Sequence, residues 1–100
     1  MNIIIKPRGG GKTTEAIRLA AEHQYHIVCV REARMIYRKA QLLGLDIPFP
    51  ITFTDFIKGT FVGQDIKGFI IDNLDLLLLQ LSRGVLVNTI TLSSPEIPRE

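Results

Sequence analysis

Three consecutive glycines, followed by a lysine and two threonines, are the residues of this sequence best suited to chemistry. The run Gly9-Gly10-Gly11-Lys12-Thr13-Thr14 lies between a short apolar segment and a helical pattern. Glycines let the backbone approach a phosphate chain, and the start of a helix presents free amides and the positive end of a dipole. Lys12 can reach the outer phosphates as a flexible charge, and the hydroxyl of Thr13 can join the coordination shell of Mg²⁺. The run predicts a binding site for a polyphosphate.

Residues beside this run have more than one interpretation. Thr14 could contact a phosphate or stabilise the first turn of the helix, and Arg8 could contact a phosphate or remain solvated. Lys6 is interpreted as a solvated flank. The competing explanation for the whole run is a glycine-rich turn beside an unrelated lysine. We include Arg8 and Thr14 among the candidate nucleotide-binding residues, because both adjoin the glycines.

An apolar segment that ends in a carboxylate is the second candidate feature. Asp72 directly follows the segment 69–71, which has no polar alternation and therefore predicts a strand buried on both faces. In a parallel sheet this carboxylate would lie at the ligand-binding edge, where Asp72 could hold Mg²⁺; alternatively, it caps the next helix. Asn73 could orient a water molecule but cannot accept its proton. Asp75 could be a displaced catalytic base or a helix cap.

The two features together resemble the Walker A and Walker B motifs of P-loop NTPases. The match covers Gly11, Lys12 and Thr13, while Lys6 stands where the general pattern has its first glycine. The chain is similar to small ATP-binding proteins of bacteriophages and prophages, within the RecA-like or helicase-like branch. That resemblance implies ATP and Mg²⁺ as cofactors and a slow ATPase in phage DNA metabolism or packaging. Asn73 stands in place of the usual glutamate, so fast hydrolysis is not expected.

Two alternatives to an ATPase remain open. The first is a catalytically inactive nucleotide-binding module with a regulatory or assembly role, which would need a partner. The second is a small nucleotide kinase, which would require a lid and an acceptor site for which 100 residues leave little room.

A basic segment raises the question of nucleic acid. The segment 52–56, with Thr54, resembles a threonine-phenylalanine motif of helicase-like ATPases. This resemblance implies that Arg31 and Arg34 could contact single-stranded DNA together with Thr54. Arg31, Arg34 and Arg38 share one face of the expected helix, which would allow a contact with the phosphate backbone. The alternative is a solvated face opposite the apolar side of the same helix.

The order of elements predicts an α/β fold. Apolar β-branched runs alternate with helical periodicities, which is typical of a parallel sheet covered by helices. With the resemblance, the expectation is a minimal P-loop NTPase three-layer sandwich with a mainly parallel five-stranded sheet and helices on both faces. Residues 1–92 would form the nucleotide-binding domain and 93–100 a tail. Strands are expected at 2–5, 26–30, 51–53, 68–72 and within 85–92, with helices from 12, over 32–43, after Thr54 and over 74–82.

Length and composition restrict the remaining possibilities. One hundred residues with 46% hydrophobic and 22% charged residues indicate a single globular domain, not a disordered chain. The net charge of +2 identifies no partner. The single cysteine, Cys29, and the lack of a long apolar stretch favour a cytoplasmic protein with no membrane partner, in the host cytoplasm if it is phage-encoded. Because there is no second lobe, a homo-oligomer or a protein partner is expected to complete the site.

Overall fold

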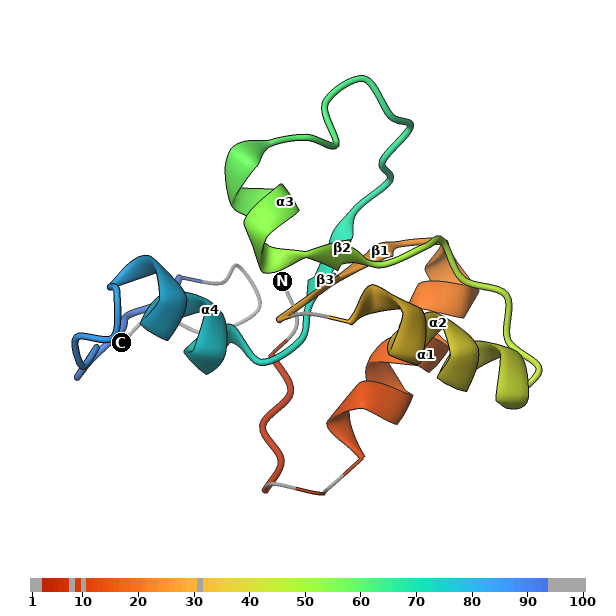
Figure 1. Cartoon of the computed structure of the whole chain (residues 1–100). Coiled ribbons are helices and arrows are strands. Elements are labelled where there is room, and N and C mark those ends of the chain that lie inside the picture. The colour runs from red at the N-terminus through yellow and green to blue at the C-terminus, as the bar shows by residue number, and fades with distance from the viewer. Residues whose placement is uncertain (1–2, 8, 10, 31, 94–100) are drawn as a thin grey trace.

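The computed structural model describes residues 3–7, 9, 11–30 and 32–93. In this part of the chain, four helices and three short strands follow one another along the sequence (Figure 1). Their order is α1 (Lys12–His23), β1 (His26–Cys29), α2 (Ala33–Leu42), β2 (Ile51–Thr52), α3 (Phe53–Lys58), β3 (Phe69–Ile71) and α4 (Leu74–Leu81).

The strands form one parallel sheet in the order β2-β1-β3, with β1 at its centre. Val28 is the residue of β1 that aligns with both neighbours, with Ile51 on one side and Ile71 on the other. The pairing with β3 extends past its last residue, because the amide of Asp72 donates to the carbonyl of Val28 at 3.0 Å. Asp72 is therefore fixed by the backbone at the carboxyl end of the sheet.

Alternate residues of β1 face two different groups of helices, as the two-residue period of a strand requires. Ile27 and Cys29 pack with buried alanines of α1 and α2, including Ala16 and Ala40. Val28 instead packs in a second cluster, with Phe53 of α3 and Leu77 of α4. Helices thus lie on both faces of the three-stranded sheet.

The prediction of a five-stranded P-loop sandwich is wrong, because the described residues of the first and the last expected strand in the sequence form no strand. Residues 3–5 make no strand, and the side chains of Ile3, Ile4 and Ile5 are exposed. Residues 85–92 also make no strand, and their large apolar side chains are exposed. A β-branched sequence favours a strand only where a neighbouring strand and a covered face are present. Neither condition is met for these two segments in the described structure.

The local start of α3 also differs from the sequence-based prediction. The helix begins one residue before Thr54, at Phe53, and the Oγ1 atom of Thr52 accepts the Asp55 amide at 3.3 Å. Thr52 is therefore the capping residue, since a threonine cap accepts an amide in the first turn. Among the described residues, no helix has both the length and the apolar character that crossing a membrane requires.

Candidate phosphate and magnesium site

The glycine run ends at the start of α1 with a backbone that suits glycine. Gly9 and Gly11 have φ angles of 78° and 83°, in the left-handed region that other residues rarely adopt. Gly11 is the residue before the first helical turn and offers no side-chain cap. The first backbone hydrogen bond of α1 is donated by the Glu15 amide to the Gly11 carbonyl oxygen, at 3.1 Å. The preceding amides of the first turn have no partner within the helix and remain available to an anion.

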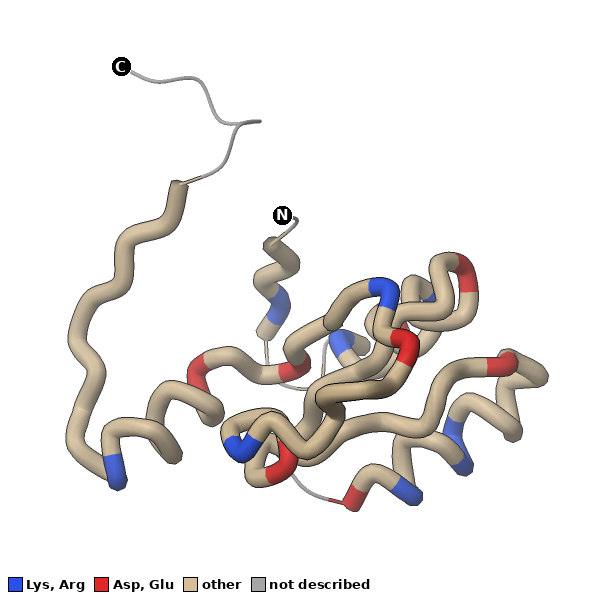
Figure 2. Tube along the Cα trace, turned by 90° about the horizontal axis from the view of Figure 1, so that it is seen from above, with Lys and Arg blue, Asp and Glu red and all other residues tan. Residues whose placement is uncertain are grey.

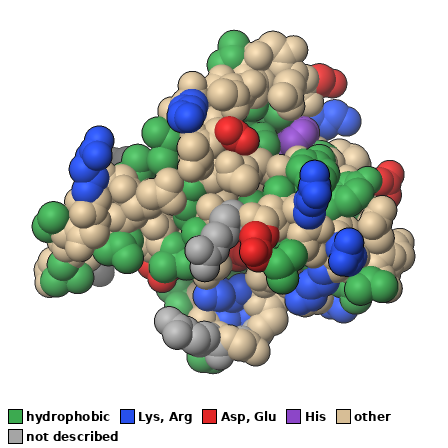
Figure 3. All heavy atoms as spheres, in the orientation of Figure 1, with side chains coloured by type: hydrophobic (Ala, Val, Ile, Leu, Met, Phe, Trp, Pro, Cys, Tyr) green, Lys and Arg blue, Asp and Glu red, His purple; other side chains and the backbone are tan. Residues whose placement is uncertain are grey.

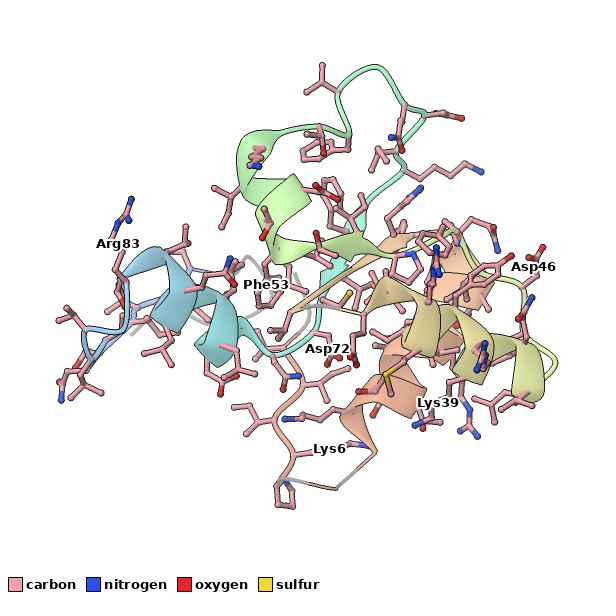
Figure 4. All side chains as sticks on the ribbon, in the orientation of Figure 1. Lys6, Lys39, Asp46, Phe53, Asp72 and Arg83 are labelled. Atoms are coloured by element: carbon pink, nitrogen blue, oxygen red, sulfur yellow. The ribbon has the colours of Figure 1, made fainter. Side chains whose placement is uncertain are left out.

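A hydrogen bond joins the first turn of α1 to the end of β3. The hydroxyl of Thr13 donates to Oδ2 of Asp72 at 3.1 Å, although 59 residues separate them in the sequence. Asp72 is only 8% exposed and is the buried charged residue of the described core. Figure 4 shows Asp72 beyond the end of β3, on the side of the sheet where α1 lies. A carboxylate buried to this degree needs a compensating charge or hydrogen bonds, and a metal ion can supply that charge.

Lys12 makes the second contact between the same two segments. Its Nζ atom donates to Oδ1 of Asn73 at 2.9 Å. Asn73 precedes α4 and has a φ angle of 63°, which asparagine tolerates better than most residues. The backbone turn at Asn73 thereby aims an amide oxygen at the lysine. The structure brings together the pairs Lys12–Asn73 and Thr13–Asp72, all four of which were candidate site residues in the sequence.

These residues fit a magnesium ion that keeps most of its water ligands. Mg²⁺ prefers oxygen ligands in octahedral geometry and is usually held by one or two protein oxygens together with substrate phosphates. The hydroxyl of Thr13 and the carboxylate of Asp72 provide two such oxygens within hydrogen-bonding distance of each other. Among the described residues, no three His, Cys, Asp or Glu side chains gather into a metal-binding group.

An open groove of about 620 Å³ borders the glycine run. It begins at Gly11 and Thr14 and continues along the outer side of α1 to Arg18 and Leu19. Its volume lies within the range of roughly 300–1,000 Å³ that is typical of small-molecule sites. Neither Lys12 nor Asp72 lines it, so the groove adjoins the polar pairs without containing them.

Other candidate residues lie away from these contacts or outside the described residues. Asp75 is an exposed residue in the first turn of α4 and has no hydrogen bond to the four residues above. Arg34 on α2 and Thr54 on α3 are likewise exposed, and their side chains have no hydrogen bond to these four residues. Arg8, Gly10 and Arg31 lie outside the described residues.

Two contacts at the site could not be read from the sequence. Lys6, expected to be a solvated flank, forms an ion pair with Glu15, with Nζ and Oε2 2.6 Å apart. Asn73, expected to orient a water molecule, accepts a hydrogen bond from Lys12. Both contacts join generic polar residues, and no spacing or motif marks them in advance. Glu15 also places a negative charge in the first turn of α1, where it interacts favourably with the positive end of the helix dipole.

The thiol of Cys29 lies near the site but is not exposed to solvent. Its side chain is 3% exposed, and its sulfur lies 3.6 Å from the carbonyl oxygen of Ile51. Burial, together with the negative charge of Asp72, raises the pKa of Cys29 to about 11. The thiol is therefore protonated at neutral pH and is a poor nucleophile.

We expect Cys29 in the folded protein to react with a thiol reagent at pH 8 at least roughly 100-fold more slowly than in the urea-unfolded chain, because both thiolate formation and access are reduced. The Asp72→Asn variant should react faster than the wild type, since it removes the negative charge. Labelling rates measured at several pH values check this expectation. Equal rates in the folded and unfolded chains would contradict it.

The raised pKa of Cys29 also makes the stability of the fold depend on pH. Because the pKa of this thiol is higher in the folded than in the unfolded chain, its contribution to the free energy of unfolding is full below about pH 8.5 and is lost as the pH rises through 11.

No protein-family model, no curated protein and no solved structure matches this chain.

Proposed function

We propose that the start of α1 and the end of β3 form a magnesium-dependent binding site for a nucleoside triphosphate such as ATP. The observation that carries this proposal is the bond between the Thr13 hydroxyl and the buried Asp72 carboxylate. A hydroxyl and a carboxylate, both oxygen ligands of the kind that Mg²⁺ prefers, lie directly after a glycine turn and beside a lysine. An isolated glycine turn would not require a buried carboxylate from a distant strand.

The residues divide the task by their chemistry. The free amides of the first helical turn would hold phosphate oxygens, and Lys12 would exchange its bond to Asn73 for one to a phosphate. Thr13 and Asp72 would hold Mg²⁺, which neutralises phosphate charge when it is bound. Without the metal, the Asp72 carboxylate repels the same phosphates. Binding is therefore expected to depend strongly on Mg²⁺.

Hydrolysis at this site would be slow. The residue after Asp72 is an amide, and Asn73 can position a water molecule but cannot take its proton. Phosphate release under steady-state conditions distinguishes a slow ATPase from a binding module without turnover. Release that Asp72→Asn abolishes supports the enzyme, and release at the background rate supports the binding module.

The magnesium dependence gives the main test. A fluorescent ATP analogue is titrated into the wild type and Asp72→Asn, each with Mg²⁺ and with EDTA. In the wild type, Mg²⁺ should tighten binding by at least roughly tenfold. In Asp72→Asn this increment should largely disappear, while binding in EDTA stays equal or becomes tighter because a negative charge has been removed.

The asparagine is a matched substitution, because it keeps the shape of the side chain and an oxygen that can accept the Thr13 hydroxyl. Two results would reject the proposal. One is a wild-type signal that does not change up to millimolar nucleotide. The other is a variant that keeps the full effect of Mg²⁺.

A further inference from the structure

The open groove beside the glycine run has a lining that the phosphate and magnesium contacts do not use. Thr14 and Glu15 lie one turn before Arg18 and Leu19 on α1, so all four of these lining residues share one side of the helix. From Gly11 to the last of them the helix rises by roughly 12 Å, at about 1.5 Å per residue. The groove is therefore long enough for a ribose and a base placed end to end.

The groove and the phosphate site share the start of α1. Gly11 and Thr14 line the groove, and the free amides of the first helical turn lie between them in the sequence. The contact of Thr13 with Asp72 marks the other side of this turn, because Asp72 does not line the groove. A triphosphate whose outer phosphates lie beside Lys12 and the metal would therefore direct its other end into the groove.

The lining of the groove suits a nucleoside better than further phosphates. Lys6 and Glu15 neutralise each other, with Nζ and Oε2 2.6 Å apart. Arg18 is exposed and has no ion pair within the part of the chain that the structure describes. Leu19 adds a partly buried apolar side chain. One cation beside an apolar wall attracts a second group of phosphates only weakly, whereas a planar guanidinium stacks well on a base.

We infer that this groove holds the nucleoside part of the ligand, with the guanidinium of Arg18 stacked on the base and Leu19 as the apolar wall. The inference rests on the proposed nucleotide site, which fixes the phosphates at the mouth of the groove. The carboxylate of Glu15 has lone pairs beyond the one that meets Lys6, so it can also accept hydrogen bonds from the ribose hydroxyls. Affinity for the nucleoside and affinity for the phosphates would then depend on different residues.

Inorganic tripolyphosphate separates the groove from the phosphate site, because it has three linked phosphates and no nucleoside. Isothermal titration calorimetry with Mg²⁺ measures the affinities of ATP and of tripolyphosphate. The wild type should bind ATP at least roughly tenfold more tightly, although tripolyphosphate carries the larger negative charge. Arg18→Ala should weaken ATP binding by roughly 5- to 150-fold, as the loss of one base stack predicts, and should change the affinity for tripolyphosphate by no more than about twofold.

Two further variants separate stacking from general charge. Arg18→Lys keeps the positive charge but not the planar guanidinium, so it should lose most of the ATP affinity that Arg18→Ala loses. General charge needs a control, because basic side chains gather over α1 and α2 on the face in Figure 3 and basic positions follow one another along α2 in Figure 2. Arg38 is an exposed arginine of α2 that does not line the groove. Arg38→Ala should therefore change both affinities by no more than about twofold.

Several results would overturn the inference and leave the phosphate site intact. ATP that binds no more tightly than tripolyphosphate, or an unchanged ATP affinity in Arg18→Ala, would mean that the groove holds no nucleoside. Equal losses of both ligands in Arg18→Ala, or full ATP affinity in Arg18→Lys, would assign this arginine to the phosphates. If the wild type binds neither ligand, the proposed function fails, and the inference fails with it.

Discussion

Replacing Lys12 by alanine is expected to weaken the binding of Mg²⁺-ATP by roughly 10- to 150-fold, which corresponds to the loss of one charge-assisted hydrogen bond. The ammonium group lies beside the free amides at the start of α1 and is held by Asn73 rather than by a carboxylate. It therefore keeps its full positive charge for a phosphate. An amide oxygen is also a weaker competitor than a carboxylate would be, so the exchange of partners costs little.

Lys6 provides the control for this experiment. It lies on the other side of the glycine run, and its charge is already neutralised by Glu15. The Lys6→Ala variant removes the same charge from the same region, yet it should change the affinity by no more than about twofold, because an exposed ion pair contributes little. Titration of a fluorescent ATP analogue in the presence of Mg²⁺ compares the two variants. Equal losses in both would mean that only the general charge of the region matters, and an unchanged affinity in Lys12→Ala would exclude this lysine from the site.

Asn73→Gly separates the two roles of the asparagine. Glycine accepts the φ angle of 63° without strain, so this variant removes the partner of Lys12 and preserves the backbone. Asn73→Ala adds the cost of a left-handed conformation to the loss of the amide. A comparison of both variants in the same titration therefore distinguishes the hydrogen bond from the turn.

The central part of the fold could be predicted from the sequence because local signals there agree with tertiary ones. The run of small residues in α1, including Ala16 and Ala20, has a helical period, and both residues are buried against the sheet. The segment 69–71, predicted from its lack of polar alternation to be a strand buried on both faces, does become the strand β3, but it lies at one edge of the sheet and its three residues are only partly buried. Helical periodicity and β-branched runs reflect the burial of particular positions. They therefore predict the correct element wherever those positions are buried in the structure.

The absence of the first and last expected strands could not be predicted in the same way. Ile3, Ile4 and Ile5 have as strong a β-propensity as any segment of the chain, yet they remain exposed. Strand formation there would need the free edge of β3 as a pairing partner, and no local pattern reports whether that edge is accessible.

The contacts within the site also depend on tertiary structure that the sequence does not report. The identities of Lys12, Thr13 and Asp72 suggested a common ligand, but the contact of Lys12 with Asn73 depends on the left-handed turn between β3 and α4.

The largest effect on stability is expected from Phe53→Ala, which should lower the free energy of unfolding by roughly 3–5 kcal/mol. Phe53 is fully buried and is the largest of the fully buried side chains. It packs with Val28 of β1 and Leu77 of α4, so its ring fills the space between the sheet and the helices α3 and α4. Figure 4 shows Phe53 between α4 and the sheet. Removing the ring leaves a cavity that three short strands cannot close by shifting.

A loss of this size is a large part of the roughly 5–15 kcal/mol that stabilises a domain. Urea unfolding followed by circular dichroism measures it, and Phe49→Ala is the control. Phe49 is 52% exposed and contacts Tyr37 with ring centroids 5.2 Å apart. That variant should lose less than about 1 kcal/mol, since little of its ring leaves water on folding. Similar losses in both variants would contradict the role of Phe53.

Because Leu77 is the buried residue of α4 and packs against Phe53, the same cavity should also loosen the turn that holds Asp72 and Asn73. Mg²⁺-ATP should then bind Phe53→Ala more weakly even below the unfolding transition.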